Sequence, residues 1–219
     1  FSVTPHKAMF PDIAKSLKLK VESRLPAIRI TDLLLEVDAR TEFSNAFTHL
    51  RSGRTADNKL ALLTAILADG INLGLTRMAD VSPGITMRQL AWAHDWHIRE
   101  EGYTAAHAIL VNAQRQLPLA SLWGDGTTSS SDGQYFPAGG HAKAIGDLNA
   151  RYGPNPGAKF YRFTSDQYGA FYIIAMNANA SEAIYVLDGL LYHGSDHAIE
   201  THYVDTGGVS DMSFALCHL

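Results

Sequence analysis

The sequence contains a single cysteine, Cys217, among 219 residues. One cysteine excludes an internal disulfide bond, which fits a reducing compartment such as the cytoplasm. Long apolar runs are also missing: no window approaches 18 uncharged apolar residues, so we expect no segment to span a membrane. The region after Phe1 lacks the apolar stretch and cleavage pattern of a signal peptide. We expect both ends of the chain to be cuts in a longer protein.

An excess of positive charge is missing as well. The chain has 18 basic and 22 acidic residues and a formal net charge of −4, whereas nucleic-acid-binding proteins normally carry a basic surface. Clustered acidic metal ligands count as negative until their cations bind, however, so the balance does not exclude such a protein. With 46% hydrophobic and 18% charged residues, the composition is that of an ordinary soluble globular chain of one or two domains.

The first half of the chain, residues 1–118, has the apolar spacing of helices. Capping residues predict four helix starts: Thr31, Asp57 or Asn58, Thr86, and a position near Thr104. The first helix is expected to continue to about Gly53 and the last to end before Pro118. We therefore predict a helical layer with short connections.

The second half, residues 119–219, changes to the alternating pattern of strands. Residues 130–136 alternate, a glycine- and proline-rich loop or insertion is expected over 137–157, and residues 159–164 and 170–176 predict a hairpin. Ser181 is the expected cap of a helix, and residues 200–204 form a short strand that ends at Asp205. The order strand-strand-strand-helix-strand predicts an α/β (α+β) chain with an incomplete RNase H-like fold after the helical layer.

The segment over residues 123–136, WGDGTTSSSDGQYF, contains two aspartates. Alternation makes Asp132 project from a strand, although both Gly-Asp-Gly and Ser-Asp-Gly are also common turn sequences. We favour Asp132 over Asp125 as a functional carboxylate, because a turn at Gly124 to Gly126 explains Asp125. The predicted topology brings Asp132 and Asp205 together on adjacent central strands.

Paired carboxylates suit hard cations such as Mg²⁺ or Mn²⁺. Two such ions about 3.5 to 4 Å apart can activate a nucleophile on one side of a phosphodiester and stabilise the leaving oxygen on the other. A third acidic ligand is normally needed. Asp211 is more simply a helix cap, so we expect the third ligand beyond Leu219.

Other polar residues offer alternatives. His94 and His97 lie three positions apart on one predicted helix, and His193, His197 and His202 cluster near Asp205, which makes a zinc-dependent hydrolase an alternative. Neither set forms a sharp metal-ligand motif, so packing is the favoured interpretation of these histidines. His202 is also a candidate substrate contact. Asp166 and Asp188 are interpreted as structural. Lys159 and Arg162 could face a phosphate, but solvated positions at a strand edge are the favoured interpretation.

Four ordered motifs closely resemble the catalytic region of the replicative class II transposases, the Tn-three family. They are WGDGTTSSSDGQYF at 123–136, FTSDQYGAFY at 163–172, YVLDGLLYH at 185–193 and HYVDTGGVSD at 202–211. Upstream, LPAIRITDLLLEVDARTEF and HLRSGR resemble the segment that leads into this region. The resemblance covers essentially the whole chain.

The resemblance implies a DDE triad on an RNase H-like fold, with Asp132 and Asp205 as its two aspartates and metal ligands. It also implies cleavage of transposon ends, attack of the exposed 3′ hydroxyls on target DNA and formation of a cointegrate, with two Mg²⁺ or Mn²⁺ ions. The family's glutamate falls downstream of the second aspartate, so this chain alone is expected to be inactive. DNA ends and target DNA are the expected partners, with a homodimer of the full-length protein and a cytoplasmic, nucleoid-associated location. A non-catalytic fragment that binds DNA or a sister subunit remains the alternative.

Overall fold

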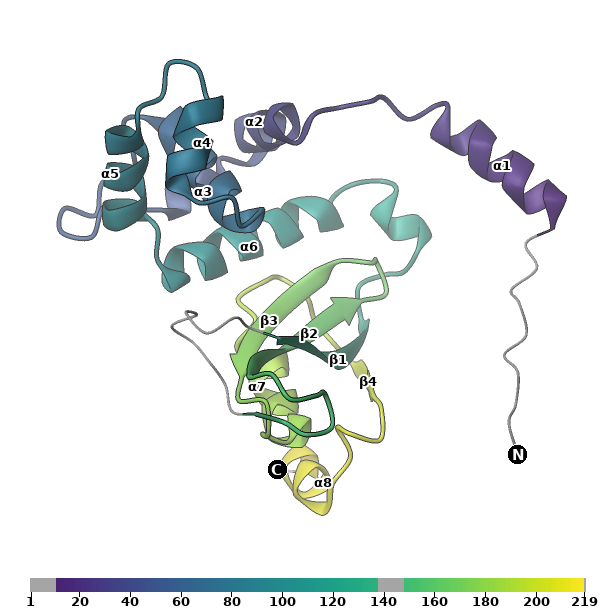
Figure 1. Cartoon of the computed structure of the whole chain (residues 1–219). Coiled ribbons are helices and arrows are strands. Elements are labelled where there is room, and N and C mark those ends of the chain that lie inside the picture. Colours follow the sequence, from purple (N-terminus) through teal and green to yellow (C-terminus); the bar gives the residue numbers. More distant parts are fainter. Residues whose placement is uncertain (1–10, 138–147, 219) are drawn as a thin grey trace.

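A computed structural model describes residues 11–137 and 148–218 as a mixed α/β molecule. Helices form one part and a four-stranded sheet with shorter helices forms the other (Figure 1). The helices of the first part are α1 (Asp12–Glu22), α2 (Ile30–Thr41), α3 (Lys59–Gly70), α4 (Leu75–Val81), α5 (Met87–His97) and α6 (Glu100–Arg115). Short 3₁₀ turns, η1 (Phe43–Ala46) and η2 (Ala120–Leu122), follow α2 and α6.

Two of the predicted helix starts are confirmed by their hydrogen bonds. The Asn58 side chain accepts a hydrogen bond from the Ala61 amide at the start of α3. At α5, the Thr86 hydroxyl accepts from the Gln89 amide while the Gln89 side chain accepts from the Thr86 amide. These reciprocal bonds satisfy amides that the helix itself leaves unpaired.

Other predicted boundaries were wrong. Helix α2 begins at Ile30 after Arg29, not at a Thr31 cap, and it ends at Thr41 because Glu42 adopts a left-handed conformation with φ of 54°. Helix α6 begins at Glu100, earlier than expected. Gly102 lies inside α6, where a Cβ atom would come within 2.8 Å of the Phe47 ring. The short helix α4 was not predicted at all.

The second part contains β1 (Thr128–Pro137), β2 (Gly157–Ser165), β3 (Ala170–Met176), η3 (Glu182–Tyr185), α7 (Val186–Leu191), β4 (Thr201–Val204) and α8 (Asp211–His218). The strand order across the sheet is β3-β2-β1-β4. Strands β1, β2 and β3 pair antiparallel, whereas β4 pairs parallel to β1. The predicted α/β class and the order strand-strand-strand-helix-strand are confirmed, consistent with an RNase H-like arrangement.

Helix α6 packs on both parts of the molecule. Its residue Ala106 belongs to a cluster with Phe47 and Leu62 of the helical part, and its Val111 belongs to a cluster with Tyr161 and Phe163 of the sheet. Figure 1 shows α6 lying between the other helices and the strands. The division into domains 1–118 and 119–219 stays a prediction.

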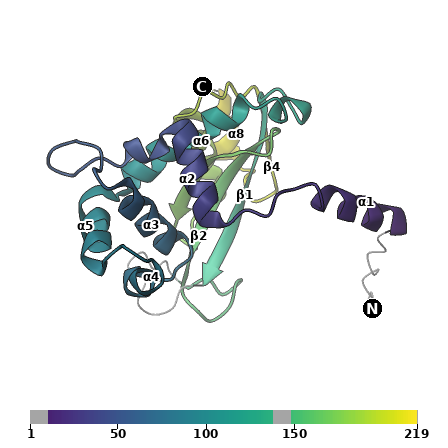
Figure 2. The same cartoon turned by 90° about the horizontal axis from the view of Figure 1, so that it is seen from above.

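Helix α1 stands apart from the rest of the molecule in both views (Figures 1 and 2), and it contains no buried residue. Within residues 11–137 and 148–218, no helix is long and apolar enough to cross a membrane. Residues 138–147 of the loop expected over residues 137–157 lie outside the described residues. Its last part is described, and there Leu148 bridges to Pro156.

Candidate metal and phosphate site

Asp132 lies within β1, and Asp205 directly follows β4, the strand that pairs parallel to β1. Over the described residues β4 is the last strand of the sheet, so the prediction that both aspartates lie on central strands was wrong for Asp205. Ser131 of β1 pairs with Val204 of β4. The next residue in sequence is Asp132 after Ser131 and Asp205 after Val204. Both carboxylates are exposed, and both line one cavity of about 540 Å³. The structure therefore brings together the two aspartates that the sequence singled out.

The turn alternative is wrong for Asp132 and right for Asp125. Asp132 lies within β1, opposite Arg162 of β2. By contrast, the Asp125 carboxylate accepts hydrogen bonds from the Thr127 hydroxyl at 2.6 Å and the Thr127 amide at 3.0 Å. These bonds lower the pKa of Asp125. Gly126 follows with φ of +84°, a conformation that favours glycine, so Asp125 shapes a turn.

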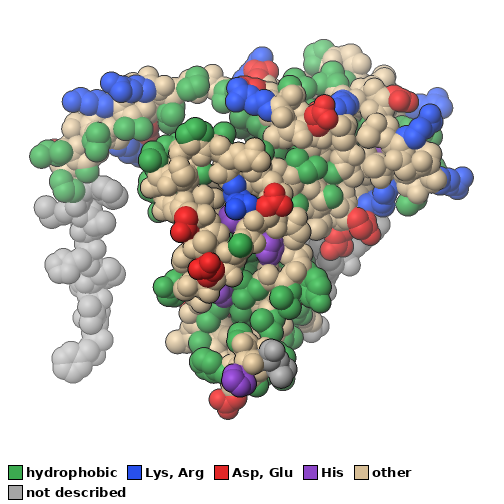
Figure 3. Space-filling model, turned by 180° about the vertical axis from the view of Figure 1, so that it is seen from behind, with side chains coloured by type: hydrophobic (Ala, Val, Ile, Leu, Met, Phe, Trp, Pro, Cys, Tyr) green, Lys and Arg blue, Asp and Glu red, His purple; other side chains and the backbone are tan. Residues whose placement is uncertain are grey.

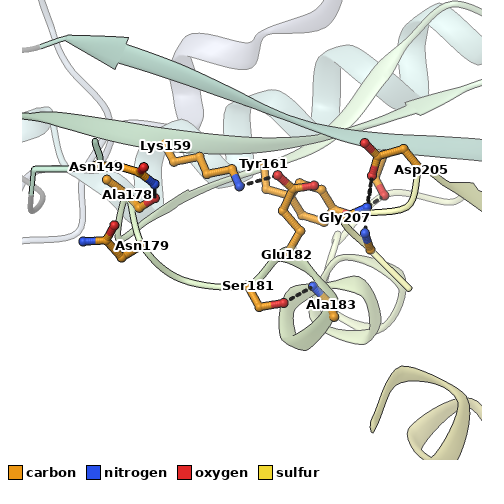
Figure 4. Close-up of polar contacts among 12 residues, drawn as sticks. Asn149, Lys159, Tyr161, Ala178, Asn179, Ser181, Glu182, Ala183, Asp205 and Gly207 are labelled. Atoms are coloured by element: carbon orange, nitrogen blue, oxygen red, sulfur yellow. Dashed lines mark hydrogen bonds and ion pairs between the residues drawn. The ribbon is translucent and has the colours of Figure 1, made fainter. Parts of the chain in front are cut away.

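The Asp205 carboxylate is oriented by the backbone that follows it. Its Oδ1 atom accepts hydrogen bonds from the Gly207 amide at 2.8 Å and the Gly208 amide at 3.3 Å. Figure 4 shows these contacts beside the side chain of Glu182. A Cβ atom at Gly207 would lie 3.1 Å from Asp205 Oδ1 and 3.4 Å from Glu182 Oε2, so these two carboxylates face the same small space.

A buried ion pair forms the wall of the cavity next to the aspartates. The Lys159 ammonium of β2 contacts the Glu182 carboxylate of η3, and each residue is only 8% exposed (Figure 4). A Cβ atom at Gly133 would overlap both side chains, which explains a glycine at this strand position. The expectation of solvated strand-edge positions was wrong for Lys159, which is buried, whereas Arg162 is exposed as expected. Neither residue lies at an edge of the sheet, because β2 lies between β3 and β1.

Tyr161 lies under this group of acidic residues. Its hydroxyl is 2.6 Å from the Ser131 hydroxyl, and its ring is fully buried. Burial raises the pKa of Tyr161, and the negative charges of Glu182, Asp205 and Asp132 raise it further. These three carboxylates, which line one cavity, thus all act on the same phenol.

The histidines considered as alternative zinc ligands have other partners. His202 lies between Ser129 and Ser131, with each ring nitrogen 2.8 Å from a serine hydroxyl, so it does not face the cavity as a substrate contact. His197 contacts the Gly126 carbonyl and His193 contacts Ser195. Over the described residues, no group of three or more His, Cys, Asp or Glu side chains is arranged to hold a metal ion.

The remaining acidic candidates are structural. The Asp166 carboxylate accepts a hydrogen bond from the Gly126 amide, and Asp188 accepts one from the Tyr172 hydroxyl at 2.8 Å. Asp211 is the first residue of α8, and the preceding residue caps the helix, because the Ser210 hydroxyl accepts a hydrogen bond from the Ser213 amide. Asp211 is absent from the cavity lining. The third ligand expected beyond Leu219 stays a prediction.

Three histidines, His197 buried and His193 and His202 partly buried, make the stability of the fold sensitive to acid. Burial lowers the pKa of His202 and is also the main cause that lowers those of His193 and His197. The unfolded chain takes up these protons near pH 6.5, whereas the folded chain takes them up only at lower pH. The free energy of unfolding is therefore expected to be highest above about pH 6.5 and to decrease as the pH falls below that value.

Denaturant unfolding between pH 7.5 and pH 5 measures this loss. In the variant His202→Gln the decrease is expected to be smaller than in the unsubstituted chain, since one of the responsible protons is gone. An equal decrease in both proteins would contradict the assignment to His202.

Comparison with known proteins connects this site with a protein family. The Tn3 transposase DDE domain family matches residues 32–219. The chain is 52% identical over 217 residues to the transposase for transposon Tn501 of Pseudomonas aeruginosa, covering 99% of this chain and 22% of that protein. It is 43% identical over 211 residues to the transposase for transposon Tn1546 of Enterococcus faecium, covering 95% and 21%.

A more distant relative is the transposase for transposon gamma-delta of Escherichia coli (strain K12). It is 34% identical over 203 residues, covering 91% of this chain and 20% of the relative. The chain thus spans about a fifth of the length of the curated relatives it matches. The match over residues 32–219 shows that the chain belongs to the Tn3 transposase DDE domain family.

Proposed function

We propose that this chain supplies two metal-binding carboxylates, Asp132 and Asp205, to the active site of a DNA transposase. The observation that carries the proposal is the parallel pairing of β1 and β4. This pairing brings Asp132 and Asp205 to one polar cavity, which both side chains line. The proposed reaction is cleavage at transposon ends followed by joining of the 3′ hydroxyls to target DNA. The expected product is the cointegrate of replicative transposition.

The donor set fits a hard divalent cation. Mg²⁺ is commonly bound through one or two carboxylates, with water and substrate phosphates completing its shell. Asp132 and Asp205 offer this set at an exposed position, and Glu182 is not counted because it pairs with Lys159. Held by Asp132 and Asp205, two such ions would supply Lewis-acid polarisation of the phosphodiester and activation of the attacking hydroxyl. A third carboxylate would come from a part of the relatives' length that this chain does not span.

The protein groups around the aspartates have roles of their own. The amides of Gly207 and Gly208 hold one oxygen of Asp205, so the orientation of its carboxylate is fixed before a cation arrives. Lys159 balances the charge of Glu182 and so limits the repulsion among three neighbouring carboxylates. Arg151 also lines the cavity, where it would contact a phosphate of the DNA backbone.

The partners of the whole protein follow from the same proposal. They are the terminal inverted repeats of the transposon, the target DNA and a second copy of the full-length protein. A cytoplasmic protein associated with the nucleoid would meet all three.

Calorimetric titration of the chain with Mn²⁺ tests the metal site. Asp132→Ala and Asp205→Ala are each expected to weaken binding at least tenfold, because changes even in groups that only support metal ligands typically cost about 10- to 100-fold. Asp125→Asn is the matched control, since an asparagine oxygen can accept the same hydrogen bonds from Thr127. Unchanged Mn²⁺ binding in both alanine variants would contradict the proposal, and tight zinc binding lost on replacing His193 or His197 would favour the hydrolase alternative.

A further inference from the structure

A second cavity lies in the helical part, away from the aspartates. Its volume is about 440 Å³, within the range of roughly 300 to 1,000 Å³ that small-ligand sites occupy. The cavity lies between the segment over residues 49–58 and one side of α5. The residues that matter for its chemistry are His49, Arg54, Asp57, Arg88 and Trp92.

Aromatic rings form one wall. The His49 ring stacks on Trp96 with centroids 5.1 Å apart and planes 7° apart, and Trp92 packs against Trp96 at 5.4 Å. Trp92 is nevertheless 57% exposed, so a large aromatic face is left open to a ligand. Exposed tryptophan beside polar side chains is typical of binding sites.

Unpaired positive charge lies beside the aromatic wall. Arg54 and Arg88 line the cavity, and neither forms an ion pair with a carboxylate of the described residues. A third guanidinium, that of Arg51, lies 5.2 Å above the Trp96 ring. Asp57 is the one carboxylate in the lining, so basic groups outnumber acidic ones. On the face of the molecule drawn in Figure 3, most Lys and Arg side chains lie over the helical part.

The cavity is held in shape by hydrogen bonds of its own loop. The His49 amide donates to the Arg54 carbonyl at 2.8 Å, and the Leu50 amide donates to the Trp96 carbonyl at 2.8 Å. The His49 Nδ1 atom accepts from the amides of Arg51 and Ser52. A preformed site of this kind loses little conformational entropy when a ligand binds.

We propose that this cavity binds a nucleotide of single-stranded DNA, with the base stacked on Trp92 and the phosphates on Arg54 and Arg88. Arginine and an open aromatic face together are what single-strand-binding proteins use, because every base offers a π face and every nucleotide a phosphate. A base inside a duplex cannot reach Trp92 without leaving its stack. The proposal rests on the proposed function for the presence of DNA, but it uses none of the residues of the aspartate site.

Fluorescence anisotropy with a labelled 12-nucleotide oligothymidine, in the presence of EDTA, tests the cavity on the 219-residue chain. Trp92→Ala is expected to raise the dissociation constant about tenfold, which corresponds to ~1.4 kcal/mol, whereas Trp92→Phe keeps a stacking ring and should cost less. An abasic strand of the same length is expected to bind the unsubstituted chain as weakly as oligothymidine binds Trp92→Ala. A duplex of equal length should be insensitive to Trp92→Ala.

The arginines are tested through the salt dependence of the same binding. Arg54→Ala and Arg88→Ala should each reduce the slope of log K against log salt by about 0.7, the value for one phosphate contact with a single strand. Arg77→Ala is the matched control, because Arg77 is exposed on α4 and outside the cavity lining. Asp57→Asn is expected to tighten binding, since it removes the negative charge from the lining.

Several results would overturn the proposal: no oligothymidine binding by the unsubstituted chain, equal binding of the abasic strand, or wild-type affinity in Trp92→Ala. Thermal unfolding of each variant verifies that the fold is retained. The proposed function is tested independently, because Asp132→Ala and Asp205→Ala are expected to alter Mn²⁺ binding and neither residue lines this cavity. If the Mn²⁺ experiment fails, the oligothymidine experiment can still be interpreted, and the reverse also holds.

Discussion

Replacing Asp132 or Asp205 by alanine is expected to lower the frequency of transposition by about 10²- to 10⁴-fold. The suitable protein is a chimera in which this chain replaces the matching segment of the Tn501 transposase, to which it is 52% identical over 217 residues. Metal ions at a reacting phosphodiester contribute several kcal/mol of transition-state stabilisation, and each ~1.4 kcal/mol corresponds to a factor of ten in rate. Loss of either ligand should remove most of that contribution.

The measurement is the number of transposition products formed in cells that carry a donor transposon, relative to the unsubstituted chimera. Asp125→Asn is expected to retain the frequency of that chimera, because Asp125 serves a turn and not the cavity. The two alanine variants should accumulate to the same level, since both aspartates are exposed at the surface. Transposition by Asp132→Ala at the level of the unsubstituted chimera would contradict its role as a metal ligand.

The sequence was sufficient for the two helix starts at which a side chain caps the helix through a nearby amide. Asn58 and Thr86 cap their helices through bonds to residues three positions away, so the signal lies within one turn. Strand alternation likewise placed Asp132 on β1, and the order of strands and helix placed Asp205 beside it. These predictions depend on period and order alone.

Two other local features, the end of α2 and the 3₁₀ turn η3, could not be predicted in this way. Helix α2 ends at Thr41 because Glu42 turns left-handed and the buried Asp38 carboxylate binds the amide and hydroxyl of Ser44. Apolar residues continue at helical spacing past residue 42, so the sequence pattern predicted a longer helix. The Glu182 side chain is positioned by the 3₁₀ turn η3. The sequence predicted a cap at Ser181 but not that a 3₁₀ turn would follow it.

One signal for the buried ion pair was nevertheless present in the sequence. Alternation puts Lys159 on the same face of β2 as Tyr161 and Phe163, which are the residues that a sheet buries. A charged side chain on a buried face requires a partner of opposite charge. Lys159 was therefore a candidate for a buried pair, and only the identity of Glu182 needed the structure.

Breaking this pair is expected to be among the most destabilising single changes in the sheet. Lys159→Ala and Glu182→Ala each leave one buried charge without its partner, a loss that typically costs about 3 to 5 kcal/mol. Against a total stability of roughly 5 to 15 kcal/mol, this is a large fraction. Denaturant unfolding of each variant measures the change in free energy.

The two variants are not expected to be equal. Without Lys159, the Glu182 carboxylate remains beside Asp205 and Asp132 with no cation to balance the three charges. Without Glu182, the Lys159 ammonium still has two aspartates nearby, so Lys159→Ala should be the more costly change. The double variant Lys159→Met with Glu182→Leu should be more stable than either alanine variant, because it leaves no unpaired charge. The cycle is closed by the double variant Lys159→Ala with Glu182→Ala, and additive losses in it would show that the two charges do not stabilise each other.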